Sequence, residues 1–540
     1  MSYKIIDSDF TLILILEKFF LKGQQQDSNK YPIFSLTENI SVSMLGMEEF
    51  ALILSVSFEL PVFATAIYWL LLAIFSIKEH RNNEKFSPKG PSEFPAITLL
   101  YASYNEKFVI ENSLEAVMKV DYPLDRIQVV IADDSNDETV GILDRKAREL
   151  SARGLNINVS RRTGRTGFKI GALKNAIPLV KNDLVLLLDA DSVLKPETIS
   201  DGIRALERNP KLSFVQFRVG YYNRSYNFIT RLFALSQDLM DTSIKKGSAF
   251  LKKPFSIQGG FTLIRKDDLR QVMEYNLESI TEDTEITVLL NLNGKKGTYL
   301  SYSKILSEAP FDLEIWKKQS LRVSQGWGLI VRKHWKNIFR SKKMSYSEKA
   351  GIMLLLLLPF SNISWIIVNI FSSVFTFWAF LLGLPFDLGG PFYSIFLFTP
   401  SIPFFVAGAY ALYFEGLFKP KDLILLPALS YIGACTVVLG AYGFMSGLLG
   451  KSGYFYRTPK MGVEEKESEA MKIKDRVDVP LLIFEFAVAS LGLVLGMMMA
   501  LSRNYLPALT LFGFALVTYK SMNLKDVGFI RRIFSHMAGN

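Results

Sequence analysis

The chain has 540 residues, of which 49% are hydrophobic and 21% charged, and its formal net charge is +10. With a mean hydropathy of +0.21, it is too apolar for an ordinary soluble enzyme and too charged for a bundle of membrane helices alone. One cysteine, Cys435, excludes an intrachain disulfide framework and a cysteine-based zinc site, and three scattered histidines argue against a histidine metal site. We therefore expect a soluble domain joined to membrane spans, with the basic residues at a membrane face and no nucleic-acid partner.

The N-terminal segment, residues 1–49, contains an apolar run that is interrupted by Glu17 and Lys18 and has no small-residue cleavage site after it. This pattern is typical of an amphipathic surface helix. Residues 50–77 are long enough to span a bilayer, and Glu59 within them either lies near the outer boundary or faces a polar cavity. Basic residues follow this run, so we expect a first membrane helix over residues 50–80 whose C-terminal end is cytoplasmic.

The next part of the chain, residues 81–312, alternates short apolar runs with helical stretches. Strands are predicted at 96–102, 127–132, 155–160 and 184–188. Alternation of this kind favours an open α/β sheet. Such sheets bind ligands at the carboxyl ends of their strands, so the residues after each strand are the candidates for chemistry.

Asp189 and Asp191 follow the last of these strands. Two carboxylates there would repel each other and lose hydration unless a cation lay between them. Oxygen ligands suit Mg²⁺ or Mn²⁺, so we predict that the pair binds one of these ions. A strand end followed by an Asp-Ser helix cap is the alternative, and for an isolated Asp-x-Asp the two interpretations carry about equal weight.

Polar residues also follow the first two strands and open the helix after the third. Tyr104-Asn-Glu106 and Asp133-Asp134-Ser could each merely cap a helix, but three successive acidic strand ends favour a binding site. Lys169 lies in a Gly-rich helix start that suits a nucleotide diphosphate. The sequence lacks a Gly-x-x-x-x-Gly-Lys-Ser/Thr loop, which argues against a P-loop ATPase.

These motifs occur, in this order, in the inverting family-2 glycosyltransferases. The chain resembles their membrane-embedded members, the cellulose synthase superfamily, and especially the glucomannan synthase-like branch. Motifs downstream of the sheet extend the resemblance to the membrane segments. The matching motifs are Tyr104-Asn-Glu, Asp133-Asp-Ser, Lys169-x-Gly-Ala-Leu-x-Asn175, Asp189-Ala-Asp191, Gln258-Gly-Gly260, Thr281-Glu-Asp283, Gln319-Ser-Leu-Arg322 and Phe455-Tyr-Arg-Thr-Pro-Lys460.

The resemblance implies a cytoplasmic GT-A domain, which is an open sheet that binds nucleotide sugars, and gives each motif a role. Thr281, Glu282 and Asp283 form the catalytic motif, with Asp283 as general base; taken alone, the motif could equally be a helix N-cap. The acceptor is expected over Gln258, Gly259 and Gly260. The donor-binding residues implied are Tyr104, Glu106, Asp133, Asp134, Lys169, Asp189, Gln319 and Arg322. The gating-loop residues implied are Phe455, Arg457, Thr458 and Lys460.

One position departs from the family pattern. Val323 stands where the family motif has a tryptophan that stacks on the acceptor sugar, and valine lacks the flat face that stacking needs. If the segment is helical, Trp327 lies one turn later on the same face and could bind the acceptor instead. Equally, Trp327 could pack into the membrane interface.

The remaining segments alternate basic and apolar stretches. Residues 313–348 are expected to form interfacial helices on the cytoplasmic side. Residues 349–450 should hold membrane helices, with Pro359 interrupting the first and a further span near 392–413. Because both flanks of 423–449 look cytoplasmic, we expect an interfacial or re-entrant helix there. A gating-like loop over 451–479 and a region of two membrane helices with a basic tail, 480–540, complete the chain.

We therefore predict a metal-dependent enzyme of the plasma membrane. It would transfer hexose, with inversion, from a UDP- or GDP-sugar to a growing β-linked polysaccharide and export the product through its own channel. Lys169 and Arg322 would supply fixed positive charge near the leaving diphosphate. Val323 keeps a non-processive transferase with a lipid acceptor open. A transporter with a nucleotide-sensing domain is the alternative outside enzymes, and the acidic motifs argue against it. The sequence leaves a homo-oligomer open.

Overall fold

The computed structural model describes residues 64–77, 91–275, 280–381, 425–451, 460–462 and 479–522, with isolated residues at 57, 60, 277, 406, 409–410, 412–413 and 416. All of these belong to one compact unit that begins at Ser57. Several predictions therefore lie outside the described residues. They are the N-terminal surface helix, the first part of the span at 50–77, most of the span near 392–413, the basic tail, and the gating residues Phe455, Arg457 and Thr458.

A seven-stranded mixed sheet forms the centre of the domain, in the order β3-β2-β1-β4-β6-β5-β7. The first four strands pair in parallel, and β6 is antiparallel to both of its neighbours. The prediction of an open α/β sheet is confirmed, and the sheet has GT-A-like architecture. The strands are β1 (Ile97–Ser103), β2 (Ile127–Asp133), β3 (Asn156–Ser160), β4 (Leu184–Asp189), β5 (Phe214–Tyr221), β6 (Phe261–Arg265) and β7 (Gly297–Ser307).

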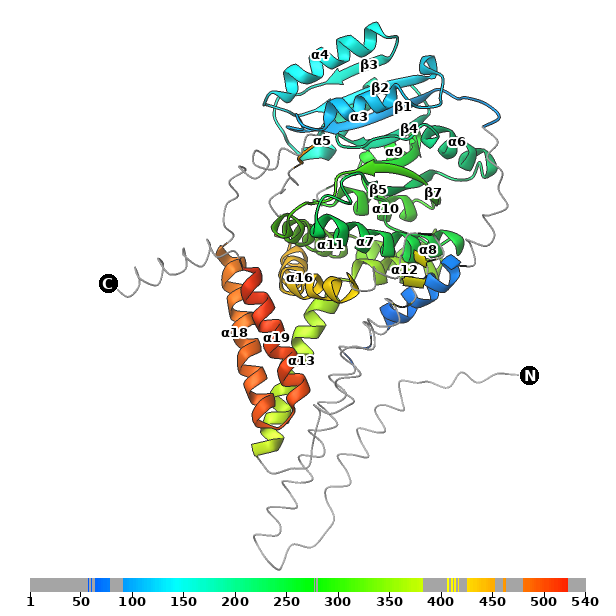
Figure 1. The fold of residues 1–540 in the computed structure, drawn as a ribbon. Coiled ribbons are helices and arrows are strands. Elements are labelled where there is room, and N and C mark those ends of the chain that lie inside the picture. The colour runs from blue at the N-terminus through cyan, green and yellow to red at the C-terminus, as the bar shows by residue number, and fades with distance from the viewer. Residues whose placement is uncertain are drawn as a thin grey trace, which may run out of the picture. The chain divides into compact units, whose positions relative to one another are not determined.

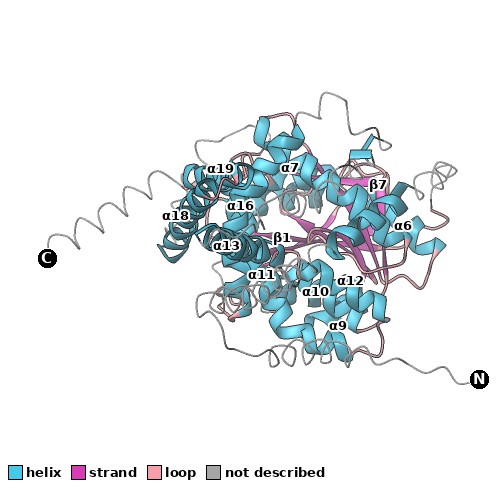
Figure 2. Ribbon diagram, turned by 90° about the horizontal axis from the view of Figure 1, so that it is seen from below, coloured by secondary structure: helices cyan, strands magenta, loops and turns pink. Residues whose placement is uncertain are grey.

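Helices cover both faces of the sheet (Figure 2). Successive residues of each strand point to opposite faces, and both sets are apolar and buried. In β1, Leu99 and Tyr101 enter one apolar core and Leu100 enters the other. The first core is closed by α3 (Ile110–Val117), α4 (Thr139–Ala152) and α6 (Thr198–Arg208); the second by α5 (Phe168–Ala176), α9 (Lys266–Met273) and α10 (Glu282–Leu292). Short 3-10 turns lie at η1 (Leu124–Arg126) and η2 (Ile177–Leu179).

The register of the central strands brings the predicted motifs to one edge. Ser103 of β1 pairs with Asp133 of β2, and Ala102 of β1 pairs with Asp189 of β4. Because these strands are parallel, their carboxyl ends lie side by side, and the loops that follow them converge.

A second group of helices packs below the sheet. One continuous arm comprises α7 (Phe228–Leu239), the π-helical turn η3 (Met240–Lys245) and α8 (Lys246–Phe250). It packs against the apolar helix Ala64–Ile77, and Phe250 stacks on Phe75. The two backbones are so close at Gly247 that an added Cβ would lie 2.0 Å from the carbonyl oxygen of Leu72. The longer helices are α11 (Leu313–Arg340), α12 (Tyr346–Leu356), α13 (Phe360–Leu381), α16 (Leu425–Leu448), α18 (Val479–Leu501) and α19 (Tyr505–Ser521).

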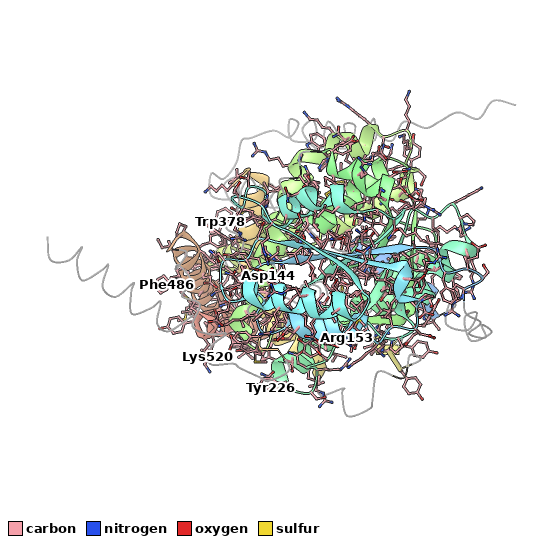
Figure 3. All side chains as sticks on the ribbon, turned by 90° about the horizontal axis from the view of Figure 1, so that it is seen from above. Asp144, Arg153, Tyr226, Trp378, Phe486 and Lys520 are labelled. Carbon is pink, nitrogen blue, oxygen red and sulfur yellow. The ribbon has the colours of Figure 1, made fainter. Side chains whose placement is uncertain are left out.

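Three helices in the described part of the chain are long and apolar enough to cross a membrane, at Phe360–Trp378, Tyr431–Leu448 and Pro480–Leu501. Large apolar side chains such as Trp378 and Phe486 are exposed on α13 and α18, whereas α4 exposes charged residues such as Arg153 (Figure 3). Exposed apolar surface of this extent is typical of contact with lipid. Helices α18 and α19 run side by side (Figure 1).

Helix α16 is packed closely against α11. A Cβ on Gly443 would lie 2.8 Å from the carbonyl oxygen of Leu321, and one on Gly447 would lie 2.1 Å from that of Gln325. Glycine at these positions lets the two backbones approach. Since α11 carries Gln319 and Arg322, this packing connects an apolar helix directly to the predicted donor site.

Candidate active site

A cavity of about 840 Å³ lies at the carboxyl ends of the central strands and extends to the apolar helices. It brings together most of the residues predicted from the sequence. Asp133 and Gly260 lie just outside its lining, and among the gating residues only Lys460 is described. The predicted residues that line it are Tyr104, Glu106, Asp134, Lys169, Asp189, Asp191, Gln258, Gly259, Thr281, Glu282, Asp283, Gln319, Arg322, Trp327 and Lys460.

The two aspartates after β2 are held by two arginines that follow β3. Arg161 donates to Asp133 at 2.8 Å, and Arg162 binds Asp134 in a bidentate pair at 2.8 and 2.7 Å. Arg162 also donates to the carbonyl oxygens of Thr166 and Phe168. The Asp134–Arg162 pair therefore fixes the loop that leads into α5 and positions its first residues.

Lys169, in the first turn of α5, lies between two carboxylates. Its ammonium is 2.7 Å from Asp189 Oδ1 and 3.0 Å from Glu282 Oε1. Burial alone would lower the pKa of Lys169, but the two carboxylates outweigh burial and raise it. In return, Lys169 and, to a lesser extent, Arg322 overcome the burial of Glu282 and lower its pKa. Both groups are therefore charged at neutral pH.

Asp191 binds Lys460, the last residue of the gating motif. Its Oδ2 accepts hydrogen bonds from Lys460 Nζ at 2.7 Å, from Ser307 Oγ at 2.6 Å and from the Glu308 amide at 2.9 Å. Burial would raise the pKa of Asp191, but Lys460 and these hydrogen bonds lower it. Only 7% of the Asp191 side chain is exposed, against 34% for Asp189, so Asp189 is the carboxylate open to a ligand.

The Glu308 side chain holds the two residues after Lys460 through their backbone amides. Its carboxylate accepts from the amides of Met461 at 2.7 Å and Gly462 at 3.0 Å, and from the Tyr222 hydroxyl at 2.7 Å. Sequence reasoning did not select Glu308, Tyr222 or the two arginines. Glu308 follows the carboxyl end of β7, which is parallel to β5 and lies in the same sheet as β4, but this pairing is visible only in the structure.

Asp283 lies at the start of α10 and faces the loop before β6. Its Oδ2 accepts from the Gly259 amide at 3.2 Å and its Oδ1 from the Thr284 amide at 2.7 Å. Burial and the neighbouring Glu282 raise the pKa of Asp283. Thr281 occupies the N-cap position but its side chain makes no cap hydrogen bond, so the motif is not explained by helix capping through that threonine.

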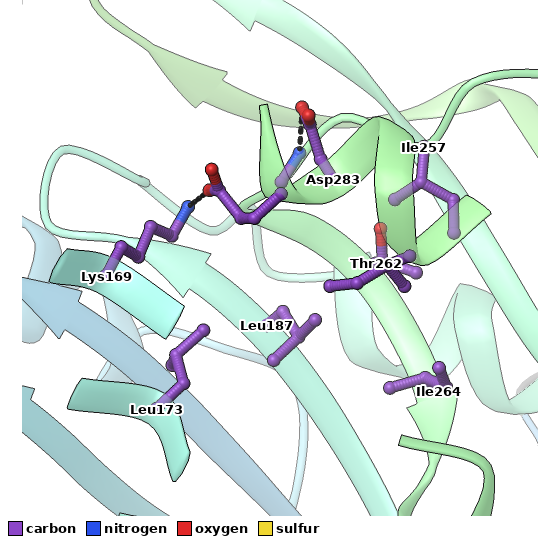
Figure 4. Close-up of a pocket in the computed structure, with 10 residues that line it drawn as sticks. Lys169, Leu173, Leu187, Ile257, Thr262, Ile264 and Asp283 are labelled. Atoms are coloured by element: carbon purple, nitrogen blue, oxygen red, sulfur yellow. Dashed lines mark hydrogen bonds and ion pairs between the residues drawn. The ribbon is translucent and has the colours of Figure 1, made fainter. Parts of the chain in front are cut away.

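The floor beneath these charges is apolar. Figure 4 shows Lys169 and Asp283 above a layer formed by Leu173, Leu187 and Ile264. Gly260, directly before β6, supports the same region, because a Cβ there would lie 2.4 Å from the amide nitrogen of Asp189 and 2.6 Å from its Oδ2. The charged groups are thus held on a packed base where each has few alternative positions.

Helix α11 supplies the opposite wall. Gln319, Arg322, Val323 and Trp327 all lie on α11 and line the cavity. The Trp327 indole donates to Thr284 Oγ1 at 3.2 Å, next to Asp283. Trp327 therefore borders both the candidate base and the cavity, while also contributing to an apolar cluster with Val288 and Phe444.

Comparisons with known proteins identify the family. The model of the glycosyl transferase family group 2 matches residues 184–412, a range that contains Asp189, Asp191, the Thr-Glu-Asp motif and Arg322. Over this range the chain is similar to the family-2 glycosyltransferases. It is a distant relative of the plant glucomannan mannosyltransferases, and the predicted family and enzyme class are confirmed.

Two Arabidopsis thaliana relatives illustrate the distance. The probable glucomannan 4-beta-mannosyltransferase 10 is 27% identical over 341 residues, which are 60% of this chain and 60% of the relative. The glucomannan 4-beta-mannosyltransferase 7 is 29% identical over 311 residues, or 55% of each chain. The similarity of this glycosyltransferase thus spans little more than half the length of these relatives.

A solved structure was also compared. The mannosyltransferase from Pyrobaculum calidifontis in complex with GDP-Man and Mn²⁺ is 16% identical and has a TM-score of 0.47, covering 73% of this chain and 99% of that one. In the part of the chain that the structure describes, no group of three or more His, Cys, Asp or Glu residues could hold a metal ion by itself.

Proposed function

We propose that this glycosyltransferase moves a hexose from a UDP- or GDP-linked donor, with inversion, to the end of a β-linked polysaccharide. The observation that carries the proposal is the position of Asp283. Its carboxylate shares one cavity with Lys169, Arg322 and the aspartates that follow β4, so a base and a set of phosphate-binding groups face the same space.

The donor diphosphate would lie on the side of the cavity that contains Lys169, Arg322 and Lys460. When the bond to the anomeric carbon breaks, its electron pair moves to a phosphate oxygen, and fixed cations stabilise that charge. Gln319 Oε1 has no hydrogen-bond partner among the described residues, which leaves it able to accept a hydrogen bond from a donor hydroxyl.

Asp189 and Asp191 would bind a divalent cation, Mg²⁺ or Mn²⁺. Asp189 is about one-third exposed, so its carboxylate is open to an ion, whereas at Asp191 the ion would replace the Lys460 ammonium, which lies 2.7 Å from Oδ2. Two carboxylates suit an ion that takes its other ligands from substrate phosphates and water. Once bound, the ion would neutralise charge on the leaving diphosphate.

Asp283 would act as the general base. The acceptor hydroxyl oxygen forms the new bond to the anomeric carbon on the face opposite the diphosphate, and its proton passes to the Asp283 carboxylate. A raised pKa suits this role, because a base works best when its pKa approaches the working pH. One displacement inverts the configuration, so an α-linked donor gives a β-linkage.

The acceptor would enter along α11 and leave between the apolar helices. Support comes from the far lining of the cavity, which includes Tyr68 on the helix Ala64–Ile77 and Asn362 on α13. We propose that a growing chain follows this path through the plasma membrane, with the catalytic domain on the cytoplasmic side. Val323 and the apolar lining at Leu355 and Leu358 favour the second candidate, a single transfer to a lipid acceptor.

A panel of UDP- and GDP-hexoses tests the proposal. The purified protein in detergent is incubated with each donor and Mg²⁺ or Mn²⁺, and released nucleotide and product length are measured together. We expect one donor to be consumed and its hexose to appear in a polymer. Consumption that yields only a singly glycosylated lipid would establish the second candidate, and no consumption of any donor would refute both.

A further inference from the structure

The helical arm α7–η3–α8 presents an unusual segment to the cavity. Its central turn, Met240–Lys245, is π-helical, and such turns are often found at functional sites. Residues before, within and after the turn line the cavity, among them Gln237, Met240 and Lys245. None of these residues belongs to the motifs that define the donor site or the base.

Lys245 is the charged residue of this wall. It is only 7% exposed, and its ammonium forms an ion pair with Asp241 at 2.8 Å. The angles of that pair do not suit a hydrogen bond, and no other described residue accepts one from Lys245 Nζ. An ammonium has three N–H donors, and leaving them unused in a buried position is costly. The cavity is where an acceptor for them could lie.

The neighbouring loop offers the complementary atom. Gln258 Nε2 donates to Gln237 Oε1 at 3.4 Å, while Gln258 Oε1 is buried without a hydrogen-bond partner among the described residues. The backbone amide of Gln258 donates to Gln216 Oε1 at 3.0 Å. The backbone amide of Gly259, the next residue, donates to Asp283. The unpaired acceptor atom of Gln258 is therefore close to the candidate base, and Lys245 lines the same cavity on the arm that carries Gln237.

We infer that Lys245, Gln237 and Gln258 form a subsite for a sugar unit of the acceptor, behind the hydroxyl that reacts at Asp283. This inference rests on the proposed function and adds a specificity-determining wall to it. The ligand class is a neutral, hydroxyl-rich saccharide, since each ring hydroxyl can accept from Lys245 and donate to Gln258. An anionic sugar fits less well, because Asp241 already offsets the charge of Lys245.

Kinetics with soluble acceptors test this assignment. Mannohexaose and cellohexaose serve as probes with the donor identified above, and donor and acceptor KM values are measured separately. We expect Lys245→Met to raise the acceptor KM at least about tenfold more than it changes the donor KM. Lys245→Arg, which keeps the charge and the N–H donors, should recover part of the loss. Gln237→Leu should shift the acceptor KM in the same direction, and serves if Lys245→Met does not fold.

Lys252→Met is the matched control, because Lys252 is exposed two residues after the end of α8 and does not line the cavity. It should leave both KM values within about twofold of wild type. An unchanged acceptor KM in Lys245→Met and Gln237→Leu, with a wild type that uses the oligosaccharides, would overturn the subsite alone. If neither oligosaccharide affects or binds the wild type, the polysaccharide acceptor and the subsite are both wrong.

Discussion

At the scale of single residues, Asp283 carries the most specific expectation. Asp283→Asn keeps the shape of the side chain and one of the two hydrogen bonds from the Gly259 and Thr284 amides, but removes the ability to take a proton. We expect transfer to fall by at least about 10²-fold, the usual scale for loss of a general base, while the donor Kd stays near wild type. Donor binding is measured by calorimetry and transfer by nucleotide release. A loss of donor binding instead would make Asp283 a donor ligand.

The surroundings of Asp283 also predict a pH dependence. Burial and Glu282 raise its pKa, and a general base is active only when deprotonated, so kcat/KM should fall as pH drops through that raised value. Glu282→Gln removes the negative neighbour and leaves Lys169 with one carboxylate fewer, so the pKa of Asp283 should decrease. We expect the acidic limb of the pH–rate profile to move to lower pH in this variant. If the acidic limb does not move, the group that titrates there is not Asp283.

Asp191 tests the metal. We expect Asp191→Asn to abolish turnover nearly completely, because it weakens cation binding and the contact with Lys460, while the protein still elutes as a folded species in detergent. EDTA should inhibit the wild type, and added Mn²⁺ or Mg²⁺ should restore it. Full activity in EDTA is incompatible with metal dependence. The unrelated variant Asp125→Asn, whose exposed side chain lies on the turn η1, should keep wild-type activity.

At the scale of elements, the parallel strands were predictable and the helical arm was not. Short apolar runs in the sequence indicated β1 to β4. The carboxyl ends of parallel strands lie at one edge of a sheet, so Tyr104, Asp134 and Asp189 were expected to lie close together. The antiparallel β6 and the parallel β7 lack such a simple signal, so Glu308 was missed. The π-helical turn also gave no sign in the sequence, since its residues have no distinctive spacing.

The contact between α11 and α16 can be tested by substituting a glycine. Gly447→Ala places a Cβ 2.1 Å from the carbonyl oxygen of Gln325, so the two helices must separate. Overpacking of this kind costs about 1–3 kcal/mol, and we expect a lower Tm in detergent. Gly433→Ala on the same helix is the control, because no atom lies within 4 Å of its added Cβ. It should be neutral or slightly stabilising, since alanine favours helix; equal losses in both variants would argue against the close contact.

At the scale of the whole molecule, the product length of the proposed polymerase would depend on how long the acceptor stays between the sheet domain and the apolar helices. Sequence reasoning identified the missing tryptophan at Val323 and the candidate Trp327, but could not tell acceptor contact from core packing. The structure explains the difficulty, because Trp327 takes part in both: it lines the cavity and also packs with Phe444 of α16. A residue with two surroundings has no unique pattern in the sequence.

Trp327→Ala distinguishes a polymerase from a single-transfer enzyme. If the indole holds the acceptor, its loss should shorten the polymer while slow donor hydrolysis continues, since a stacked ring is worth about 1 kcal/mol, enough to change the residence time of a chain several-fold. Trp327→Phe keeps a flat ring without the hydrogen bond to Thr284 and should make products of intermediate length. Val323→Trp should lengthen the product, because position 323 also lines the cavity. A wild type whose only product is a singly glycosylated lipid, unchanged by Trp327→Ala, would leave the acceptor platform without a role, because one transfer needs no retained chain.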